Sequence, residues 1–341
     1  MGKKKKRIGI LTAGGDCPGL NAAIRGIGKT AILNYGMEVL GFNAGYSGLI
    51  RKDYQVLDEI KLSGILTLGG TILGTSREKP FKIDKENPID KVALIKENYK
   101  ELDLDCVVCL GGNGTMKTAN KLQQEGLNVI GLPKTIDNDV YGTDRTFGFD
   151  SAVSIATDAI DRLHTTANSH QRAMVIEVMG HHAGWIALYA GVAGGGDVIL
   201  LPEIDFDIET VCHTIRKRFE RGKPYAIVVV AEGIKKPNNT NAASYVSYCI
   251  HDMTGIETRQ TQLGYVQRGG SPTPMDRILA TQYGAYAVDL IANEDYGKMV
   301  AFQQNELIGV PLSEVGGKLS LIKPDNKLVI KARNLGVSFG D

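Results

Sequence analysis

The sequence predicts an α/β protein that consists of two doubly wound, Rossmann-like domains with mostly parallel sheets. Short β-branched runs alternate along the chain with longer segments whose apolar residues recur at the helical period of 3.6. The predicted strands are apolar throughout, as strands covered on both faces by helices are. The chain has 341 residues, which exceeds the size at which a single core usually keeps growing, so we expect two domains.

The strands and helices can be placed in order from these patterns. The first strand covers Ile8 to Thr12, and a helix follows from Asn21 to Asn34 with isoleucines at helical spacing. A second helix starts near Met116 and a third at Ser151, after a turn-rich crossing from Tyr141 to Asp150. The remaining strands are expected at Cys106–Leu110, Val129–Leu132, Met174–Val178, Val198–Leu201 and Ala226–Val230.

Charge and hydropathy exclude several classes of function. The 39 Lys and Arg residues nearly cancel the 38 Asp and Glu residues, so no global field attracts nucleic acid or an anionic membrane. The longest apolar stretch, Ala183 to Gly196, is glycine-rich and too short to span a bilayer. The five cysteines are scattered, which fits reduced thiols. We therefore expect a cytoplasmic protein with no nucleic-acid partner and no membrane attachment.

Two glycine-rich turns follow predicted strands. Gly14-Gly15-Asp16-Cys17-Pro18-Gly19 follows the first strand, and Gly111-Gly112-Asn113-Gly114-Thr115 lies between a strand and a helix, where backbone N–H groups can face an anion. Either turn alone also fits a tight connection that needs glycine for close packing. Together they indicate a site that holds a polyphosphate.

Two other nucleotide motifs are excluded. The run Gly26-Ile27-Gly28-Lys29-Thr30 resembles the end of a P-loop, but Ala23 stands where the first glycine is required and the run lies within a predicted helix. Neither glycine-rich turn reads G-x-G-x-x-G with an acidic residue about 20 positions later, so a dinucleotide fingerprint is also absent.

The segment Thr135-Ile136-Asp137-Asn138-Asp139 places two carboxylates and a hydroxyl within five residues. In an extended chain the two Asp side chains share one side, where one could act as a general base and the other as a Mg²⁺ partner. A network of Asx-turns in a polar loop explains the spacing equally well. Four arginines next to small residues or turns, suited to phosphate, complete the candidate set: Arg77, Arg172, Arg259 and Arg268.

These pieces, in this order, resemble the phosphofructokinase family from about Arg7 to beyond Asn293. Five segments match family signatures: Gly14–Ala22, Gly70–Arg77, Thr135–Asp139, Val178–Gly180 and Gln267–Pro272. The resemblance implies a 6-phosphofructokinase of glycolysis, which transfers a phosphoryl group to the 1-hydroxyl of fructose 6-phosphate. It also implies a donor domain made of residues 1–148 plus about 267–316, and a sugar domain made of 149–266 plus about 317–341.

The resemblance also implies roles for individual residues. Asp137 would accept the proton of the sugar hydroxyl, with Thr135 placing the phosphoryl group, Arg77 bridging the donor phosphates and His181 near the transferred group. The donor site would contain Gly15, Tyr46, Arg77, Gly112, Asn113, Gly114, Thr115 and Lys134. Mg²⁺ would lie near Asn113 and Asp139.

The sugar phosphate would be held by Arg172, Arg259, Tyr265 and Arg268, with Met179, Gly180, His181 and Glu232 on the sugar and Thr135 and Asp137 at its reacting end. In the family, Arg172 and Arg259 reach across from a neighbouring subunit. The resemblance therefore implies an oligomer with a shared sugar site, a homotetramer in the common bacterial form or else a dimer.

Two positions bear on the phosphoryl donor. Gly114 leaves room for the α-phosphate of ATP, where pyrophosphate-dependent members typically carry Asp. Lys134 is typical of pyrophosphate-dependent members, but it also occurs in a branch that uses ATP. Because a carboxylate next to an α-phosphate would repel it and a lysine need not exclude it, Gly114 favours ATP over the pyrophosphate alternative.

Two departures from the family leave a further alternative open. Asn113 stands where most members have Asp beside the metal, so it offers Mg²⁺ an oxygen without a charge. His181 replaces an arginine that steadies the transferred phosphate in many members. A catalytically weakened regulator that binds sugar phosphate is therefore the second alternative, and the retention of Asp137, Thr135, Asp139 and Arg77 argues against it.

Overall fold

The structure, a computed structural model, describes residues 5–82 and 88–341. Contacts between Cα atoms divide the chain into two compact units. The first unit contains residues 1–135, 140–150 and 268–319, and the second contains residues 136–139, 151–267 and 320–341. Both units interleave α-helices with a largely parallel sheet, which confirms the predicted fold class.

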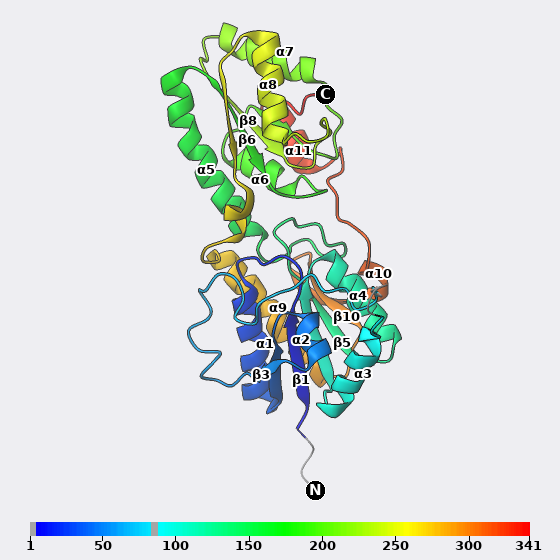
Figure 1. The fold of residues 1–341 in the computed structure, drawn as a ribbon. Coiled ribbons are helices and arrows are strands. Elements are labelled where there is room, and N and C mark those ends of the chain that lie inside the picture. Colours follow the sequence, from blue (N-terminus) through cyan, green and yellow to red (C-terminus); the bar gives the residue numbers. More distant parts are fainter. Residues whose placement is uncertain (1–4, 83–87) are drawn as a thin grey trace. The chain divides into compact units, whose positions relative to one another are not determined.

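The first unit has a seven-stranded sheet in the order β11-β10-β5-β4-β1-β2-β3 (Figure 1). Its strands are β1 (Arg7–Thr12), β2 (Glu38–Phe42), β3 (Tyr54–Val56), β4 (Cys106–Gly111), β5 (Val129–Pro133), β10 (Lys298–Gln303) and β11 (Glu306–Pro311). Its helices are α1 (Leu20–Tyr35), α2 (Tyr46–Arg51), α3 (Lys91–Glu101), α4 (Asn113–Gln124), α9 (Pro274–Ala292) and α10 (Leu312–Val315).

The centre of this sheet is parallel and its two edges are antiparallel. Strand β1 pairs in parallel with β2 and β4, and β4 pairs in parallel with β5. The outer pairs β2–β3 and β10–β11 are antiparallel. The sequence analysis identified β1, β4 and β5 within one residue at each end, but it did not place β2, β3, β10 and β11. The two edge strands, β3 and β11, are less buried and have less uniform apolar runs.

Helices α1 and α9 pack against each other very closely. A Cβ atom on Gly26 would lie only 2.7 Å from the carbonyl oxygen of Thr281, and one on Gly284 only 2.6 Å from that of Ala23. Residues Gly26 to Thr30 lie inside α1, as predicted. The glycine at position 26 therefore allows two helices to approach and does not belong to a phosphate loop.

The core of the first unit includes side chains between the sheet and the helices α2, α3 and α4. Phe42 and Tyr46 are buried there together with Ile95 of α3 and Met116 of α4. Figure 1 shows α1 and α9 on one side of this sheet and α3 and α4 on the other. Because helices cover both faces of the sheet, a ligand can approach the sheet only at the ends of its parallel strands.

The second unit has a four-stranded parallel sheet in the order β7-β8-β6-β9. Its strands are β6 (Ala173–Val178), β7 (Val198–Leu200), β8 (Ala226–Ala231) and β9 (Thr258–Gln262), and the short 3₁₀ helix η1 spans Gly264–Arg268. Its helices are α5 (Phe149–His170), α6 (Trp185–Ala193), α7 (Ile208–Glu220), α8 (Ala242–Thr254) and α11 (Lys327–Asn334).

The predicted strands of this unit are confirmed within one residue at each end, and α5 begins two residues before the predicted Ser151. Strand β9 was missed because its sequence, Thr-Arg-Gln-Thr-Gln, is polar and lies at the edge of the sheet. None of the helices in the described ranges combines the length and hydropathy that crossing a membrane requires.

Candidate active site

The first unit brings three polar turns to one edge of its sheet. Strands β1, β4 and β5 are adjacent and parallel, so the segments after Thr12, Gly111 and Pro133 leave the sheet at the same edge. The chain passes from β1 to β2 on one side and returns to β4 on the other, so β1 and β4 flank the point where the strand order reverses. Ligands of doubly wound sheets bind at this point.

The turn after β1 is joined to a segment 60 residues further along the chain. Ala13 forms a parallel bridge with Ser76, and the Gly14 N–H donates to the Ser76 carbonyl at 2.9 Å. The Thr75 hydroxyl donates to the Gly14 carbonyl at 2.6 Å. The exposed Arg77 follows Ser76 directly, so it comes one residue after the segment that is bonded to the glycine turn.

Two cations lie against the same turn. A Cβ atom on Gly15 would lie 2.5 Å from the guanidinium Nη1 of Arg268, so only glycine lets Arg268 lie this close. Lys134 is almost fully buried, and its Nζ donates a hydrogen bond to the Gly15 carbonyl. Two cationic side chains therefore lie against the turn at Gly15, where they could attract a polyphosphate.

The N-terminus of α4 is the third part of this edge. The helix begins after Gly112, its first turn carries no acidic residue, and its N-cap residue is a glycine, which has no side chain to cap the N–H groups. A Cβ atom on Gly114 would meet no atom within 4 Å. The amino end of α4 therefore offers backbone donors and a favourable dipole to an anion, with open space at Gly114.

Tyr46 packs beneath the first turn of α4 in the core and is not exposed at the surface where a ligand would bind. Its side chain is buried, and its hydroxyl donates to the Thr115 carbonyl at 3.3 Å. Burial raises the pKa of the Tyr46 hydroxyl well above its ordinary value, so the hydroxyl stays protonated and remains a donor. Tyr46 thus fixes the first turn of α4.

Asn113 makes a contact that its sequence position does not reveal. Its side-chain oxygen Oδ1 accepts a hydrogen bond from the Gly317 N–H at 2.9 Å, which fastens the start of α4 to a segment about 200 residues away. Gly317 has a φ of 91°, a conformation that favours glycine. The bond uses one of the two lone pairs that Asn113 could offer a metal ion.

The expected extended geometry of the Thr135–Asp139 segment is wrong at its centre. Asn138 has a φ of 52°, which is the left-handed region, so Asp137 and Asp139 do not alternate with Asn138 as they would in a strand. Asn tolerates this conformation better than most residues. The Thr135 carbonyl accepts the Thr146 hydroxyl at 2.7 Å, and the Asp139 carbonyl accepts the Ser320 N–H at 2.9 Å.

The second unit gathers four predicted sugar residues at the carboxyl edge of its sheet. Met179, Gly180 and His181 follow β6, and Glu232 follows the neighbouring β8. One carboxylate oxygen of Glu232, Oε1, accepts the His181 N–H at 2.9 Å and the Gly180 N–H at 3.3 Å.

Glycine is required in these two turns. A Cβ atom on Gly180 would lie 2.3 Å from the Ala183 carbonyl oxygen, and one on Gly233 would lie 2.0 Å from the His181 carbonyl oxygen. The turns after β6 and β8 therefore pack against each other, and Glu232 has a fixed place between them. The exposed Tyr265 lies in η1, after the carboxyl end of β9.

Arg172 and Arg259 lie away from these residues. Arg172 immediately precedes β6, six positions before Val178, so the strand separates it from the carboxyl edge by about 20 Å. Arg259 pairs with Met174 in the register of β9 and β6, which is about 13 Å from the same edge. Its guanidinium turns back towards the amino edge, where it contacts Glu257.

The predicted site residues thus form separate groups within the chain. The first unit contains the predicted donor residues together with Thr135 and Arg268: Gly15, Tyr46, Arg77, Gly112, Asn113, Gly114, Thr115, Lys134, Thr135 and Arg268. The second unit contains the two aspartates and the remaining predicted sugar residues: Asp137, Asp139, Met179, Gly180, His181, Glu232, Tyr265, Arg172 and Arg259. Within that unit, Arg172 and Arg259 lie in the amino-terminal half of the sheet, away from Glu232 and His181.

The predicted metal residues fit Mg²⁺ only in part. Mg²⁺ is commonly held by one or two carboxylates together with substrate phosphates and water. Asp139 supplies such a carboxylate, whereas the Asn113 oxygen is already bonded to Gly317. Within the described part of the chain, no three His, Cys, Asp or Glu side chains come together in a way that could hold a metal ion.

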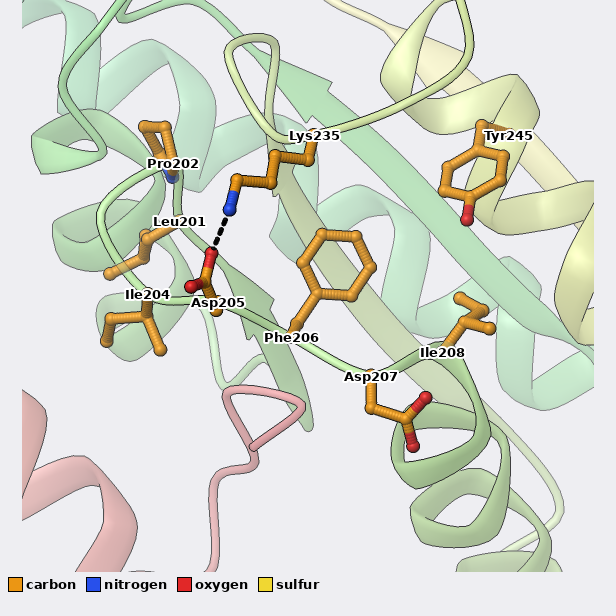
Figure 2. A pocket seen from close by; sticks show the side chains of 9 residues that line it. All are labelled: Leu201, Pro202, Ile204, Asp205, Phe206, Asp207, Ile208, Lys235 and Tyr245. Carbon is orange, nitrogen blue, oxygen red and sulfur yellow. Dashed lines mark hydrogen bonds and ion pairs between the residues drawn. The ribbon is translucent and has the colours of Figure 1, made fainter.

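A pocket of about 270 Å³ lies elsewhere in the second unit. Figure 2 shows its apolar wall, which includes Phe206 and Ile208, and an ion pair of 2.5 Å between Lys235 and Asp205. Both charged side chains are highly exposed. None of the residues predicted from the sequence lines this pocket.

The sequence of the chain matches the phosphofructokinase family profile over residues 7–291. The chain belongs to the phosphofructokinase family. It is 60% identical to ATP-dependent 6-phosphofructokinase 3 of Bacteroides thetaiotaomicron, over 98% of this chain and all of that protein. It is 56% identical to ATP-dependent 6-phosphofructokinase of Spirochaeta thermophila, over 98% of each chain. The resemblance stated from the sequence is therefore confirmed.

Solved phosphofructokinases have the same fold. The T-state crystal structure from Pichia pastoris superposes with a TM-score of 0.85 at 33% identity, over 92% of this chain and 36% of that one, so this chain spans about a third of the yeast protein. A pyrophosphate-dependent phosphofructokinase from Nitrosospira multiformis superposes with a TM-score of 0.86 over 98% of this chain and 93% of that one. At 21% identity, this second likeness concerns the fold alone.

Proposed function

We propose that the chain is an ATP-dependent 6-phosphofructokinase, which transfers the γ-phosphoryl group of ATP to the 1-hydroxyl of fructose 6-phosphate and yields fructose 1,6-bisphosphate. Two relatives with 60% and 56% identity, aligned over nearly their whole length, carry this name. Such identity over both chains leaves little room for a different reaction at the same site.

The observation that carries the proposal is the carboxyl edge of the first unit. Two glycine turns flank the reversal of strand order, and the second of them forms the amino end of α4, whose N-cap residue is Gly112. Arg268 and Lys134 add positive charge at Gly15. ATP phosphates would bind here, with Arg77 bridging them and Gly114 leaving room for the α-phosphate.

The chemistry requires little beyond positioning and charge. Asp137 accepts the proton of the sugar 1-hydroxyl while the hydroxyl oxygen bonds to the γ-phosphorus, and the bond from that phosphorus to the oxygen bridging to the β-phosphate breaks. ADP leaves with the electron pair of that bond. Thr135 places the transferred group, and His181 lies beside the sugar end of the reaction.

Mg²⁺, when bound, neutralises the charge of the donor phosphates. We assign its carboxylate partner to Asp139. We also assign Asn113 to the donor end of the site, where its hydrogen bond to Gly317 favours a role in fixing the start of α4 over direct charge compensation.

The sugar site is proposed to be shared between subunits. Met179, Gly180, His181 and Glu232 contact the sugar in one subunit, together with Tyr265 and Arg268. Arg172 and Arg259 lie too far along the sheet to hold the same phosphate, so they would come from a neighbour. We propose a homotetramer, with a dimer as the alternative, that acts in glycolysis in the cytoplasm.

The deciding experiment compares two donors on one enzyme preparation. Purified protein with fructose 6-phosphate and Mg²⁺ receives either ATP or pyrophosphate, and kcat/KM is measured for each donor. We expect a higher kcat/KM for ATP. A higher value for pyrophosphate would reassign the donor, a reading that the buried Lys134 makes worth testing. Binding of fructose 6-phosphate without turnover on either donor would identify a regulator instead.

A further inference from the structure

Glu257 lies between the two arginines at the amino half of the second sheet and has no role in the reaction as described above. Its carboxylate Oε1 is 2.6 Å from Nη2 of Arg259, and its Oε2 is 3.6 Å from Nη2 of Arg172. One carboxylate therefore contacts both guanidiniums, each through a different oxygen.

The backbone holds Glu257 in place. It immediately precedes β9, and its carbonyl accepts the Ala173 N–H at 3.0 Å, which continues the pairing of β6 with β9. Ala173 follows Arg172 directly, so the same hydrogen bond fixes the main chain next to both Arg172 and Glu257. The main chain that carries the Glu257 carboxylate is therefore fixed by the hydrogen bonds between β6 and β9.

Arg259 is held on two sides. Glu257 and Arg259 are two positions apart in an extended segment, so their side chains lie on the same face. Besides its bond to Glu257, Arg259 donates from Nη1 to the Thr258 carbonyl at 2.8 Å. A guanidinium has five N–H donors, so these bonds orient the group and leave donors for an anion.

The side chain of Arg172 is less exposed than that of Arg259, and one of its N–H groups is not used in a hydrogen bond with any residue that the structure describes. Its side chain is 17% exposed, and within the described residues its buried Nε has no hydrogen-bond partner. The distance of 3.6 Å to Glu257 makes this contact an ion pair without a hydrogen bond. Two neighbouring guanidiniums repel each other, and the single carboxylate between them offsets part of that repulsion while a net positive charge remains.

We propose that Glu257 is a positioning residue for the sugar phosphate: it holds Arg172 and Arg259 side by side so that both can bind the 6-phosphate together. The proposal rests on the proposed function, which assigns these arginines to that phosphate. The substrate dianion then meets a pair of guanidiniums already oriented, and less ordering is needed on binding. The opposite role, a carboxylate that competes with the phosphate, predicts the reverse effect of removing its charge.

The test separates positioning from competition through KM and kcat for fructose 6-phosphate. For Glu257→Ala we expect KM to rise about tenfold while kcat stays within about twofold, because the arginines contact a group remote from the reacting atoms. For Glu257→Gln, which keeps an acceptor oxygen for Arg259, we expect KM within about threefold of the wild type, on the high side. A KM below that of the wild type in Glu257→Gln would establish competition and overturn the proposal.

Two further variants make the result specific. Asp205→Ala removes the carboxylate of the exposed ion pair with Lys235 in the same unit (Figure 2), and we expect it to leave KM unchanged. In an Arg259→Gln background, Glu257→Ala is expected to add much less to KM than it does alone, because the two residues act together. Additive effects would overturn the proposal.

The assay of the wild type distinguishes a failure of the role proposed for Glu257 from a failure of the proposed function. Turnover by the wild type combined with an unchanged KM in Glu257→Ala would overturn the role of Glu257 and leave the function intact. Absence of wild-type turnover and of calorimetric binding of fructose 6-phosphate would overturn both. If Glu257→Ala melts below the assay temperature, Glu257→Asp decides, since its shorter side chain keeps the charge but cannot reach both arginines. An unchanged KM in that variant would also overturn the proposal.

Discussion

The two units place their candidate residues in different ways. In the first unit, the turns after β1, β4 and β5 leave the sheet at the same end. Arg268 lies against the first of these turns, and Arg77 follows Ser76, which forms a bridge with Ala13. In the second unit, Glu232 and His181 lie at the carboxyl edge, whereas Arg172 and Glu257 lie at the amino edge. Under the proposed function, a single chain would present a donor site but would need a neighbouring subunit to complete its sugar site.

The cause of this difference is the register of parallel strands. All carboxyl ends in a parallel sheet lie at one edge, so residues that follow strands come together and residues that precede strands are left about a strand length away. The candidate donor residues follow strands. The two arginines proposed to bind the sugar phosphate precede a strand or lie at its start, which is why the proposed function assigns them to the sugar site of a neighbouring subunit.

The largest effect is expected at the proposed base. Replacing Asp137 with Asn keeps the size of the side chain but removes the proton acceptor, so we expect kcat with ATP to fall by about 10³ while KM for fructose 6-phosphate changes little. Steady-state kinetics measure both quantities. A kcat within tenfold of the wild type would remove Asp137 from the reaction and with it the assignment of the reacting end of the site.

The second effect tests the donor edge of the first unit. Gly114→Asp introduces a side chain where a Cβ atom meets nothing within 4 Å, so the fold should be unchanged. Its charge would lie next to the donor phosphates, and we expect kcat/KM for ATP to fall by about 100-fold. Thermal melting serves as the control for folding. Undiminished use of ATP would contradict the place assigned to the α-phosphate.

The third prediction tests whether the sugar site is shared. Asp137→Asn and Arg259→Gln should each be nearly inactive at low fructose 6-phosphate. When the two variants are dissociated, mixed and reassembled, some sites combine an intact Asp137 from one subunit with an intact Arg259 from another. We expect the reassembled mixture to be at least about tenfold more active than either variant alone, because each variant lacks either the proton acceptor or a phosphate-binding arginine in all of its sites. Mixtures no more active than their parents would mean that each subunit forms its own site.

The fourth prediction concerns the contact between Gly15 and Arg268. A methyl group at position 15 would lie 2.5 Å from the Arg268 guanidinium, so Gly15→Ala should displace that side chain. We expect kcat/KM to fall about tenfold with a small change in stability, because the displaced group is the flexible end of a side chain. Arg268→Gln and the double variant Gly15→Ala/Arg268→Gln serve as controls, because the effect of Gly15→Ala should largely vanish once the guanidinium is absent. Additive effects of the two substitutions would argue against a specific role of Arg268.

The smallest effect is expected at His181. It is exposed, it stacks edge-on against His182 at 3.8 Å between ring centroids, and it has a φ of 52°. Arginine at this position would add a permanent charge near the transferred phosphate, so we expect His181→Arg to keep or raise kcat, by at most about threefold. The measurement is kcat at saturating ATP and fructose 6-phosphate. A loss of more than tenfold would show that the imidazole has a role of its own.

Local patterns in the sequence were sufficient for the fold class and for the family. Strands such as Cys106–Leu110 and Ala226–Val230 are apolar along their whole length, so their burial on both faces could be predicted. The edge strands β3, β9 and β11 were not predicted because an exposed edge strand need not have such a pattern. The residue roles, taken from the family resemblance, stay predictions until they are measured.

Two glycine-rich turns after buried strands could be predicted from the amino-acid sequence, because glycines and β-branched runs reflect local backbone preferences. Three features became evident only in the folded chain: the bond between Asn113 and Gly317, the left-handed Asn138 between the two aspartates and the contacts of Glu257 with two arginines. Each of these depends on which distant segments meet, and that is set by strand register and packing. Such contacts cannot be predicted from a pattern within a few consecutive residues.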